Sequence, residues 1–381
     1  FPPPDGFQPL NTANTRPVKV ISRPDQYVGA IIHTQNPGAV KRYQTPGRFA
    51  PDFVWSKERG GSSAHNVFDT VRGATKRIRP NTDNAEDTQS NMVQAFHNDG
   101  FTYGIEYPNN SGQTGVYWCW KAGGSKNTFN VDDVGYASAA AAGLDGGTIT
   151  PTGASVGTKQ GFSIIKYQGN GTSGANISHG LLEAPKLMVH KSLDQSRNWY
   201  TITTVPDGQP RYAYINSTNH FNGSAVTAPT SSLMNFTGSQ ESNNSGENYI
   251  VYMWHDVPGL QKFGTYEGSG VAGNYVHLGF RPALLWIKNF DDTTIKNWGI
   301  IDSTRSYANV GNHTLATNLD NGESFFGDGS SVYGANNKID LLSDGFRLQE
   351  TSGFGNASGI TFLYCAWAEA PSIDLYGGGA N

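Results

Sequence analysis

Two pairs of oppositely charged residues have the same spacing in distant parts of the chain. Asp69 stands three positions before Arg72, and Asp302 stands three positions before Arg305. A carboxylate and a guanidinium form parallel charge-assisted hydrogen bonds, which suit either an anion site or the end of a turn. Because the same spacing occurs twice, we expect both pairs to stabilise a turn or strand end rather than to perform chemistry.

A second candidate site is the segment 209–223, in which aromatic residues alternate with short polar ones. Aromatic rings stack on sugar faces, and short polar side chains hydrogen-bond sugar hydroxyls, so the segment suits carbohydrate recognition. An ordinary half-buried strand shows the same alternation. Both interpretations stay open at this point. The candidate ligand-binding residues are Tyr212, Tyr214, His220 and Phe221.

Several residue patterns that indicate catalysis or metal binding are missing from the sequence. A glycosidase needs two carboxylates about 5–10 Å apart, and no predicted strand carries acidic residues at alternate positions. Cysteine pairs at zinc-binding spacing do not occur. Asp132-Asp133 and Asp291-Asp292 could contribute to a Ca²⁺ site, but no loop offers the six to eight oxygens that Ca²⁺ takes. We predict a protein that is not an enzyme and has no cofactor or metal.

The candidate residues belong to a unit that occurs three times in the sequence. Each complete copy has a proline-led apolar run, the Asp-x-x-Arg pair, an Asp-Gly-Phe turn and a strand ending in tryptophan. The run, turn and last strand lie at 51–57, 99–101 and 116–120 in copy one, and at 282–288, 344–346 and 361–367 in copy three. Copy two has the run at 185–191 and the last strand at 249–254, but it lacks the Asp-x-x-Arg pair and the Asp-Gly-Phe turn.

Turn glycines and sulfur-containing residues add further repeat positions. Gly100 and Gly345 are the turn glycines of the two complete copies. The two cysteines, Cys119 and Cys365, are predicted to hold one slot in copies one and three, with Met253 in that slot in copy two. A buried free thiol packs as a small hydrophobe, which favours a core position over a disulfide or a reactive thiol.

Length and composition predict the fold class. The chain has 381 residues, which suggests about two to three domains. It contains 47 glycines and 12% aromatic residues, a composition typical of short strands joined by many turns. We predict an all-β protein made of three tandem antiparallel β-sandwich-like modules, with a proline-rich N-terminal arm.

The repeat also sets the predicted domain boundaries. Proline richness and the lack of periodicity indicate an extended arm at 1–25. Glycine-rich composition indicates a linker at 125–160, rich also in Ala and Thr, and a tail at 373–381. The three β modules are then expected at 26–124 for copy one, 161–258 for copy two and 259–372 for copy three.

Charge and hydropathy exclude two classes of partner. Only 15% of the residues are charged and the net charge is −4, so no overall field favours nucleic acid. No apolar run approaches the roughly 18 residues that a membrane-spanning helix needs. We therefore expect no nucleic-acid partner and no membrane span.

The repeated stretches resemble a family of β-rich modules found in structural proteins of tailed bacteriophages, especially those of aquatic hosts. In copy one the resemblance lies in residues 51–57, 68–76, 99–101 and 118–124. Further along it includes residues 161–167, 180–181, 184–187, 280–283 and 344–346. Together these stretches extend the resemblance over nearly the whole chain.

The resemblance implies a virion location and supplies no catalytic residue. It leads us to expect a non-enzymatic structural protein of a tail fibre, spike or head-attached appendage, with a surface for host attachment. The expected partners are other virion proteins, a host surface glycan and copies of the chain itself, in a homo-oligomer that is a trimer by family analogy. Two alternatives stay open: a secreted carbohydrate-binding module protein, and a glycan-degrading enzyme on a β-sandwich.

Overall fold

The computed structural model describes residues 20–34, 39–105, 114–291, 297–306, 309, 311, 313–325, 339–351 and 355–371. The predicted arm at 1–25 lies mostly outside these residues, and the predicted tail at 373–381 lies wholly outside them. Within the described part the chain is all-β, with one short 3-10 helix, η1 (Pro24–Gln26), and no α-helix. The predicted fold class is confirmed.

Copy one consists of two antiparallel sheets. The inner sheet has the order β1-β9-β3-β4, with bounds Val28–Thr34, Thr114–Trp120, Phe53–Glu58 and Asn66–Asp69. The outer sheet has the order β2-β8-β7, with bounds Lys41–Gln44, Gly100–Tyr103 and Val93–His97. A short pair, β5 (Lys76–Arg77) and β6 (Asp87–Thr88), follows β4. The strands predicted around residues 51–57 and 116–120 are thus neighbours in one sheet.

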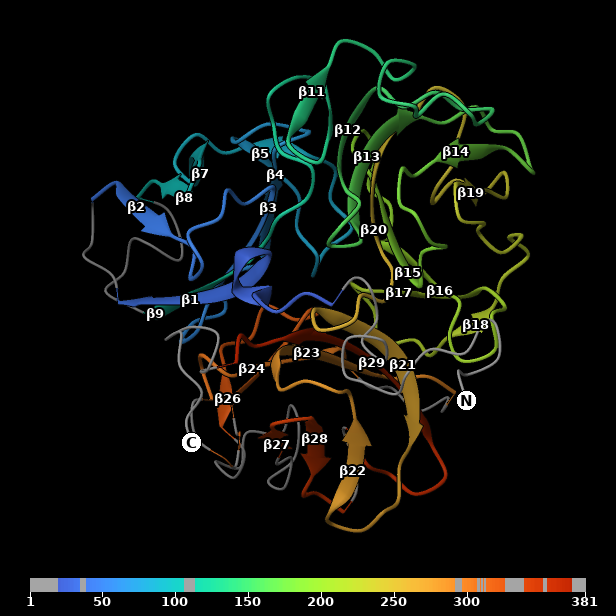
Figure 1. Cartoon of the computed structure of the whole chain (residues 1–381). Helices are drawn as coiled ribbons and strands as arrows, with labels where there is room; N and C mark the ends of the chain where they lie inside the picture. The colour runs from blue at the N-terminus through green and yellow to red at the C-terminus, as the bar shows by residue number, and fades with distance from the viewer. Residues whose placement is uncertain are drawn as a thin grey trace, which may run out of the picture.

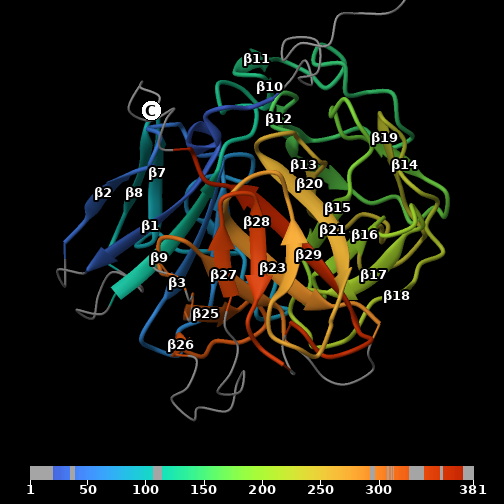
Figure 2. The same cartoon turned by 60° about the horizontal axis from the view of Figure 1, so that its bottom comes forward.

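Copy three repeats this arrangement. Its inner sheet has the order β21-β29-β23-β24-β25-β26, with bounds Gln261–Glu267, Thr361–Ala368, Pro282–Asn289, Gly299–Asp302, His313–Ala316 and Ser324–Phe325. Its outer sheet has the order β22-β28-β27, with bounds Asn274–His277, Gly345–Leu348 and Ile339–Leu342. Figure 2 shows this outer sheet in front of β23 and β29.

Copy two has a larger inner sheet and a smaller outer one. The inner sheet has the order β11-β10-β12-β13-β20-β15-β16-β17-β18. Its bounds are Val134–Tyr136, Phe129–Val131, Gly153–Gly157, Phe162–Gln168, Asn248–Trp254, Leu187–Ser192, Tyr200–Thr203, Arg211–Tyr214 and Asn222–Gly223. The outer sheet has two strands, β14 (Asn176–Ser178) and β19 (Leu233–Asn235).

The predicted linker at 125–160 is wrong. This segment contributes β10, β11 and β12 to the inner sheet of copy two, and β10 pairs with β12 in parallel. β12 then pairs with β13 in antiparallel fashion. Its small residues suit the close packing of these strands: Ala154 and Val156 are fully buried. A composition rich in Gly, Ala and Thr was therefore compatible with sheet as well as with a linker.

The three copies lie around one shared core. Alternate residues of a strand point to opposite faces, and in each copy one face meets the outer sheet while the other meets the other two copies. All eight tryptophans of the chain belong to the shared core. The Trp367 ring lies 5.4 Å from Trp120 and 6.3 Å from Trp254, so it joins three copies at one point. Figure 1 shows the copies as three lobes around this centre, blue, green and orange.

Strand register corrects one predicted repeat position. Cys119 pairs with Val54, whereas Cys365 pairs with Trp286, the counterpart of Trp55. The two cysteines therefore point to opposite faces of equivalent strands, and the prediction that they hold one slot is wrong. Cys119 lies in the outer core of copy one and Cys365 in the shared core. Both are free and buried, and burial raises the pKa of both thiols.

Candidate functional site

The Asp-x-x-Arg pairs form matching buried clamps at the ends of β4 and β24. Asp69 accepts hydrogen bonds from the Arg72 backbone N–H at 2.8 Å and from Arg72 Nε at 2.5 Å. Asp302 accepts the same two bonds from Arg305 at the same distances. All four side chains are 0% exposed. Because these charges cannot reach solvent, the pairs hold strand ends and do not present chemistry to a substrate.

Each clamp also receives a hydrogen bond from a different copy. The Tyr252 hydroxyl of copy two donates to Asp69 at 2.7 Å, and Trp118 Nε1 of copy one donates to Asp302 at 2.9 Å. Tyr252 and Trp118 are equivalent positions, since each precedes the strand-ending tryptophan by two residues. The clamps therefore join neighbouring copies as well as closing their own turns.

Copy two replaces the clamp with uncharged residues. Register places Thr203 where the other copies have the Asp, and its hydroxyl donates to the Lys186 carbonyl within the same copy. In copy three, Cys365 stands at the position of Tyr252 and Trp118. The junction between copies three and two thus lacks both the carboxylate and the donor that form the other two junctions.

Segments of each copy contact the next copy, twice through equivalent tryptophans and once through an ion pair. Trp199 of copy two donates to the Arg79 carbonyl of copy one at 2.9 Å. Trp298, the corresponding residue of copy three, donates to the Tyr214 carbonyl of copy two at 3.0 Å. Glu323 of copy three pairs with Arg59 of copy one at 2.7 Å. These contacts close a ring of three copies.

Buried lysines mark the same docking positions. Lys191 donates to the Asp83 carbonyl of copy one at 3.1 Å, and Lys288 donates to the Thr218 carbonyl of copy two at 3.0 Å. Lys57, the third equivalent, donates to the carbonyls of Glu58 and Gly61 at 2.7 and 3.0 Å. Burial lowers the pKa of Lys57 and Lys191 to about 8. Backbone carbonyls satisfy these ammonium groups. Lys191 and Lys288 thereby join neighbouring copies, whereas both of these Lys57 acceptors lie in copy one.

Gly100 and Gly345 are placed by the backbone rather than by a ligand. A Cβ on Gly100 would overlap the Tyr43 carbonyl on β2, and a Cβ on Gly345 would overlap the Val276 carbonyl on β22. Each glycine therefore lets the strand that follows the Asp-Gly turn pair closely with its neighbouring strand. The sequence identified both as repeat positions, and the structure supplies the reason.

The candidate ligand residues of segment 209–223 separate into two groups. Phe221 is buried in the shared core, with its ring 4.9 Å from Phe290 and 5.6 Å from Trp298, so its assignment as a ligand residue is wrong. His220 lies half-buried just before β18. Tyr212 and Tyr214 lie half-buried on the other face of β17, packed against the outer core of copy two. Tyr212 pairs with Asn222, so these two side chains lie on the same face of the sheet. Phe221 is the neighbour of Asn222 in the chain, and its side chain therefore points to the opposite face.

Tyr200 joins Tyr212 and Tyr214 in a cluster that the sequence did not reveal. Its ring lies 5.4 Å from Tyr212 and 6.1 Å from Tyr214, which are 5.9 Å apart. Among the described residues, neither the Tyr212 nor the Tyr214 hydroxyl has a hydrogen-bond partner. Burial, followed by the charge of Glu241, raises the pKa of Tyr214 to about 12. The cluster combines apolar rings with free hydroxyls, which can stack on and hydrogen-bond a polar ring.

Glu241 lies close to this cluster. Asn198 Nδ2 donates to its Oε1 at 3.5 Å, and its Oε2 is buried without a partner among the described residues. Burial raises the pKa of the Glu241 carboxyl. A pattern in the sequence could have indicated that Tyr200 belongs to the cluster. Tyr200 and Ile202 alternate with threonines in the strand before β17, and β17 itself has tyrosines at alternate positions.

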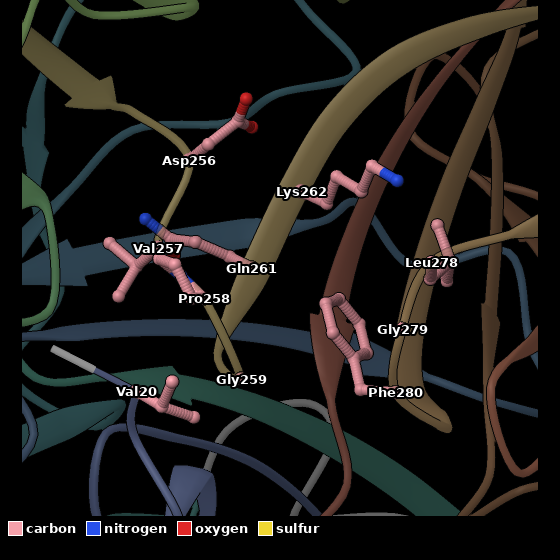
Figure 3. Close-up of a pocket in the computed structure, with 10 residues that line it drawn as sticks. All are labelled: Val20, Asp256, Val257, Pro258, Gly259, Gln261, Lys262, Leu278, Gly279 and Phe280. Carbon is pink, nitrogen blue, oxygen red and sulfur yellow. The ribbon is translucent and has the colours of Figure 1, made fainter. Parts of the chain in front are cut away.

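A pocket of about 410 Å³ lies where β21 begins, next to Val20 (Figure 3). Its wall is largely apolar, and its polar side chains already have partners in the protein. Asp256 accepts the Phe263 N–H at 2.7 Å, and Lys262 donates to the His277 carbonyl at 3.1 Å. The Gln261 amide donates to three carbonyls. The remaining lining residues are Val257, Pro258, Gly259, Leu278, Gly279 and Phe280. The pocket therefore has volume without an unpaired group that would select a ligand.

The acidic loop pairs serve the loops that carry them. Asp132 accepts hydrogen bonds from both the N–H and the hydroxyl of Thr158, and Asp291 accepts the same pair from Thr361. Asp133 pairs with Lys121 at 2.6 Å; Asp292 lies outside the described residues. Across the described part of the chain, no group of three or more His, Cys, Asp or Glu residues could hold a metal ion. No helix in that part is long and apolar enough to span a membrane.

Comparison with known proteins places the chain in a family. None of the curated proteins matches it. The sequence profile described as "Domain of unknown function (DUF7483)" matches residues 23–371, a single stretch that includes all three copies. This extent agrees with the structure, in which the copies share one core. The chain belongs to the DUF7483 family.

Proposed function

We propose that the chain is a non-enzymatic structural protein of a tailed-bacteriophage particle, part of a tail fibre, spike or head-attached appendage, and that it presents a surface for host attachment. The observation that best supports this proposal is the closed ring of copies. Two buried Asp-Arg clamps and the buried Lys191 and Lys288 join neighbouring copies around all eight tryptophans. A particle appendage needs such a body, because it must keep its shape outside the cell.

The use of charge in the repeat supports a structural role over catalysis. A catalytic carboxylate must contact its substrate, whereas Asp69 and Asp302 are wholly buried and bonded to arginine. The resemblance of the repeated stretches to phage structural modules supports the particle location. The same resemblance leads us to propose a homo-oligomer, with a trimer as the expected form.

Mass spectrometry of purified virions tests this proposal. We expect peptides of the chain in particles that have been banded on a density gradient and treated with protease to remove adhering proteins. Light scattering of the isolated chain should give the mass of a trimer. Absence of the chain from particles, at a sensitivity that detects a known minor tail protein, would refute the virion role.

The tyrosine cluster favours one alternative, a secreted carbohydrate-binding protein. Tyr200, Tyr212 and Tyr214 provide rings on one face of a sheet, as a sugar-binding surface requires. Such a protein would bind soluble glycans as a monomer and would be absent from particles. The particle experiment and the oligomeric mass therefore separate the two candidates.

A further inference from the structure

The outer sheet of copy two has one strand fewer than the outer sheets of the other copies. In copy three, Ile301 of β24 packs with Ile339 and Leu341 of the third outer strand, β27. Register makes Ile202 of β16 the counterpart of Ile301, but the outer sheet of copy two has only β14 and β19. In both views these two strands lie away from β17 and β18 (Figures 1 and 2). Where copy three has its third outer strand, this end of the copy-two sheet carries the tyrosine cluster.

Strand pairing aligns the side chains of this end in two rows. Tyr200 pairs with Tyr214, and Ile202 pairs with Tyr212. On its other side, Tyr212 pairs with Asn222, which is exposed on the edge strand β18. Residues that pair directly share a face of the sheet. The partly exposed rings of Tyr212 and Tyr214 therefore lie beside the exposed Asn222.

We propose that Tyr212, Tyr214 and Asn222 form a binding platform for a neutral saccharide. The rings would stack on the apolar face of a sugar, while the phenol hydroxyls and the Asn222 amide would bond its hydroxyl groups. This inference names the ligand class of the host-attachment surface, and so it rests on the proposed function.

The charges near the platform favour a neutral ligand over an acidic one. Arg211 is paired with Asp207 at 3.0 Å, and Arg197 is paired with Glu247 at 3.2 Å. Neither arginine is available to an anion without breaking its pair. Glu241, by contrast, adds a carboxylate close to Tyr200 and Tyr214. An acidic sugar would meet this carboxylate while both arginines are held in their existing ion pairs.

A printed array of neutral oligosaccharides of glucose, galactose and N-acetylglucosamine tests the proposal, followed by calorimetric titration with the best ligand. We expect saturable binding that Tyr212→Ala and Tyr214→Ala each weaken at least about tenfold, because each removes a stacking ring. Asn222→Ala should weaken binding about two- to tenfold, the effect of one hydrogen bond. Tyr275→Ala is the matched control, since Tyr275 is an exposed tyrosine on an outer strand of copy three and should leave binding unchanged.

Several results would overturn the platform. These are no saturable binding on the array, equal binding by the two tyrosine variants in folded form, or equal loss in the Tyr275→Ala control. If the tyrosine variants fail to fold by circular dichroism, the exposed Asn222 decides: weaker binding by Asn222→Ala supports the platform and unchanged binding refutes it. Binding by a chain that is absent from virions would keep the platform and refute the particle role. A chain that is present in virions but binds no saccharide would support the particle role and refute the platform.

Discussion

Copies one and three differ from copy two in how they use the same strand positions. Copies one and three place a buried Asp-Arg clamp at the end of the fourth inner strand and cover the outer face with three strands. Copy two has Thr203 at the clamp position and two outer strands, but it extends its inner sheet to nine. The comparison teaches that all three copies build the shared core, whereas only the two complete copies add a buried ion pair to it.

Deleting copy three should have the largest effect on folding. Trp367, Trp286 and Phe263 contribute to the core that also buries Trp120 and Trp254. A chain ending at residue 258 would expose those rings, so we expect no cooperative unfolding transition by circular dichroism or calorimetry. The full chain, prepared in the same way, is the control. A cooperative transition in the truncated chain would show that copies one and two have an independent core.

Removal of a clamp carboxylate should have the next largest effect. Asp69→Ala leaves the buried Arg72 guanidinium with Glu86, at 3.2 Å, as its one carboxylate partner among the described residues, and it removes the acceptor of Tyr252. Breaking one side of a buried ion pair costs about 3–5 kcal/mol in the free energy of unfolding. Thr203→Ala, at the same position in copy two, should cost about 1 kcal/mol, the contribution of one hydrogen bond. Urea denaturation measures both, and equal costs would remove the distinction between the copies.

Substitution of the turn glycines should have an intermediate effect. Gly100→Ala and Gly345→Ala each place a Cβ against a carbonyl of the neighbouring strand, so we expect a loss of about 1–3 kcal/mol, as for other overpacked sites. In copy two, Gly223→Ala meets no atom within 4 Å and should stay within about 0.5 kcal/mol of the natural chain. Thermal or urea denaturation distinguishes these outcomes. A large loss at Gly223 would indicate that the edge of copy two is more tightly packed than the structure shows.

Acid should destabilise copies one and two through buried histidines. Burial lowers the pKa of His33 to about 4 and that of His190 to about 3, below the ordinary value of 6.5. Between these values the unfolded chain binds more protons, so stability is full above about pH 6.5 and falls as the pH drops towards 4. The slope approaches about 1.4 kcal/mol per pH unit for each histidine.

His190→Ile sharpens this test, because Ile287 occupies the equivalent position in copy three. Urea denaturation at pH 7, 6 and 5 should show a shallower decline in the variant. The same decline in both proteins would mean that His190 does not contribute to acid sensitivity.

The sequence by itself determined most of the strands, the two turn glycines and the equivalence of the two Asp-Arg pairs. These features depend on residues close together in the chain, where alternation and turn chemistry act locally. It also suggested Tyr212 and Tyr214 as ligand candidates, but it grouped them with Phe221, whose side chain points to the shared core. Alternation tells that a strand has two faces, and it does not tell which neighbour covers each face.

Only the tertiary structure decided how the copies meet. Trp118 and Tyr252 find their partners 184 and 183 residues away, and no local pattern encodes such a distance. A register difference of one residue sends Cys119 and Cys365 to different cores, because successive side chains point to opposite faces of a sheet. The segment 125–160 became strand because copy two offered it an edge to pair with, and Asn222 came beside Tyr212 for the same reason. Backbone pairing between distant segments is set by packing of the whole chain, which composition does not specify.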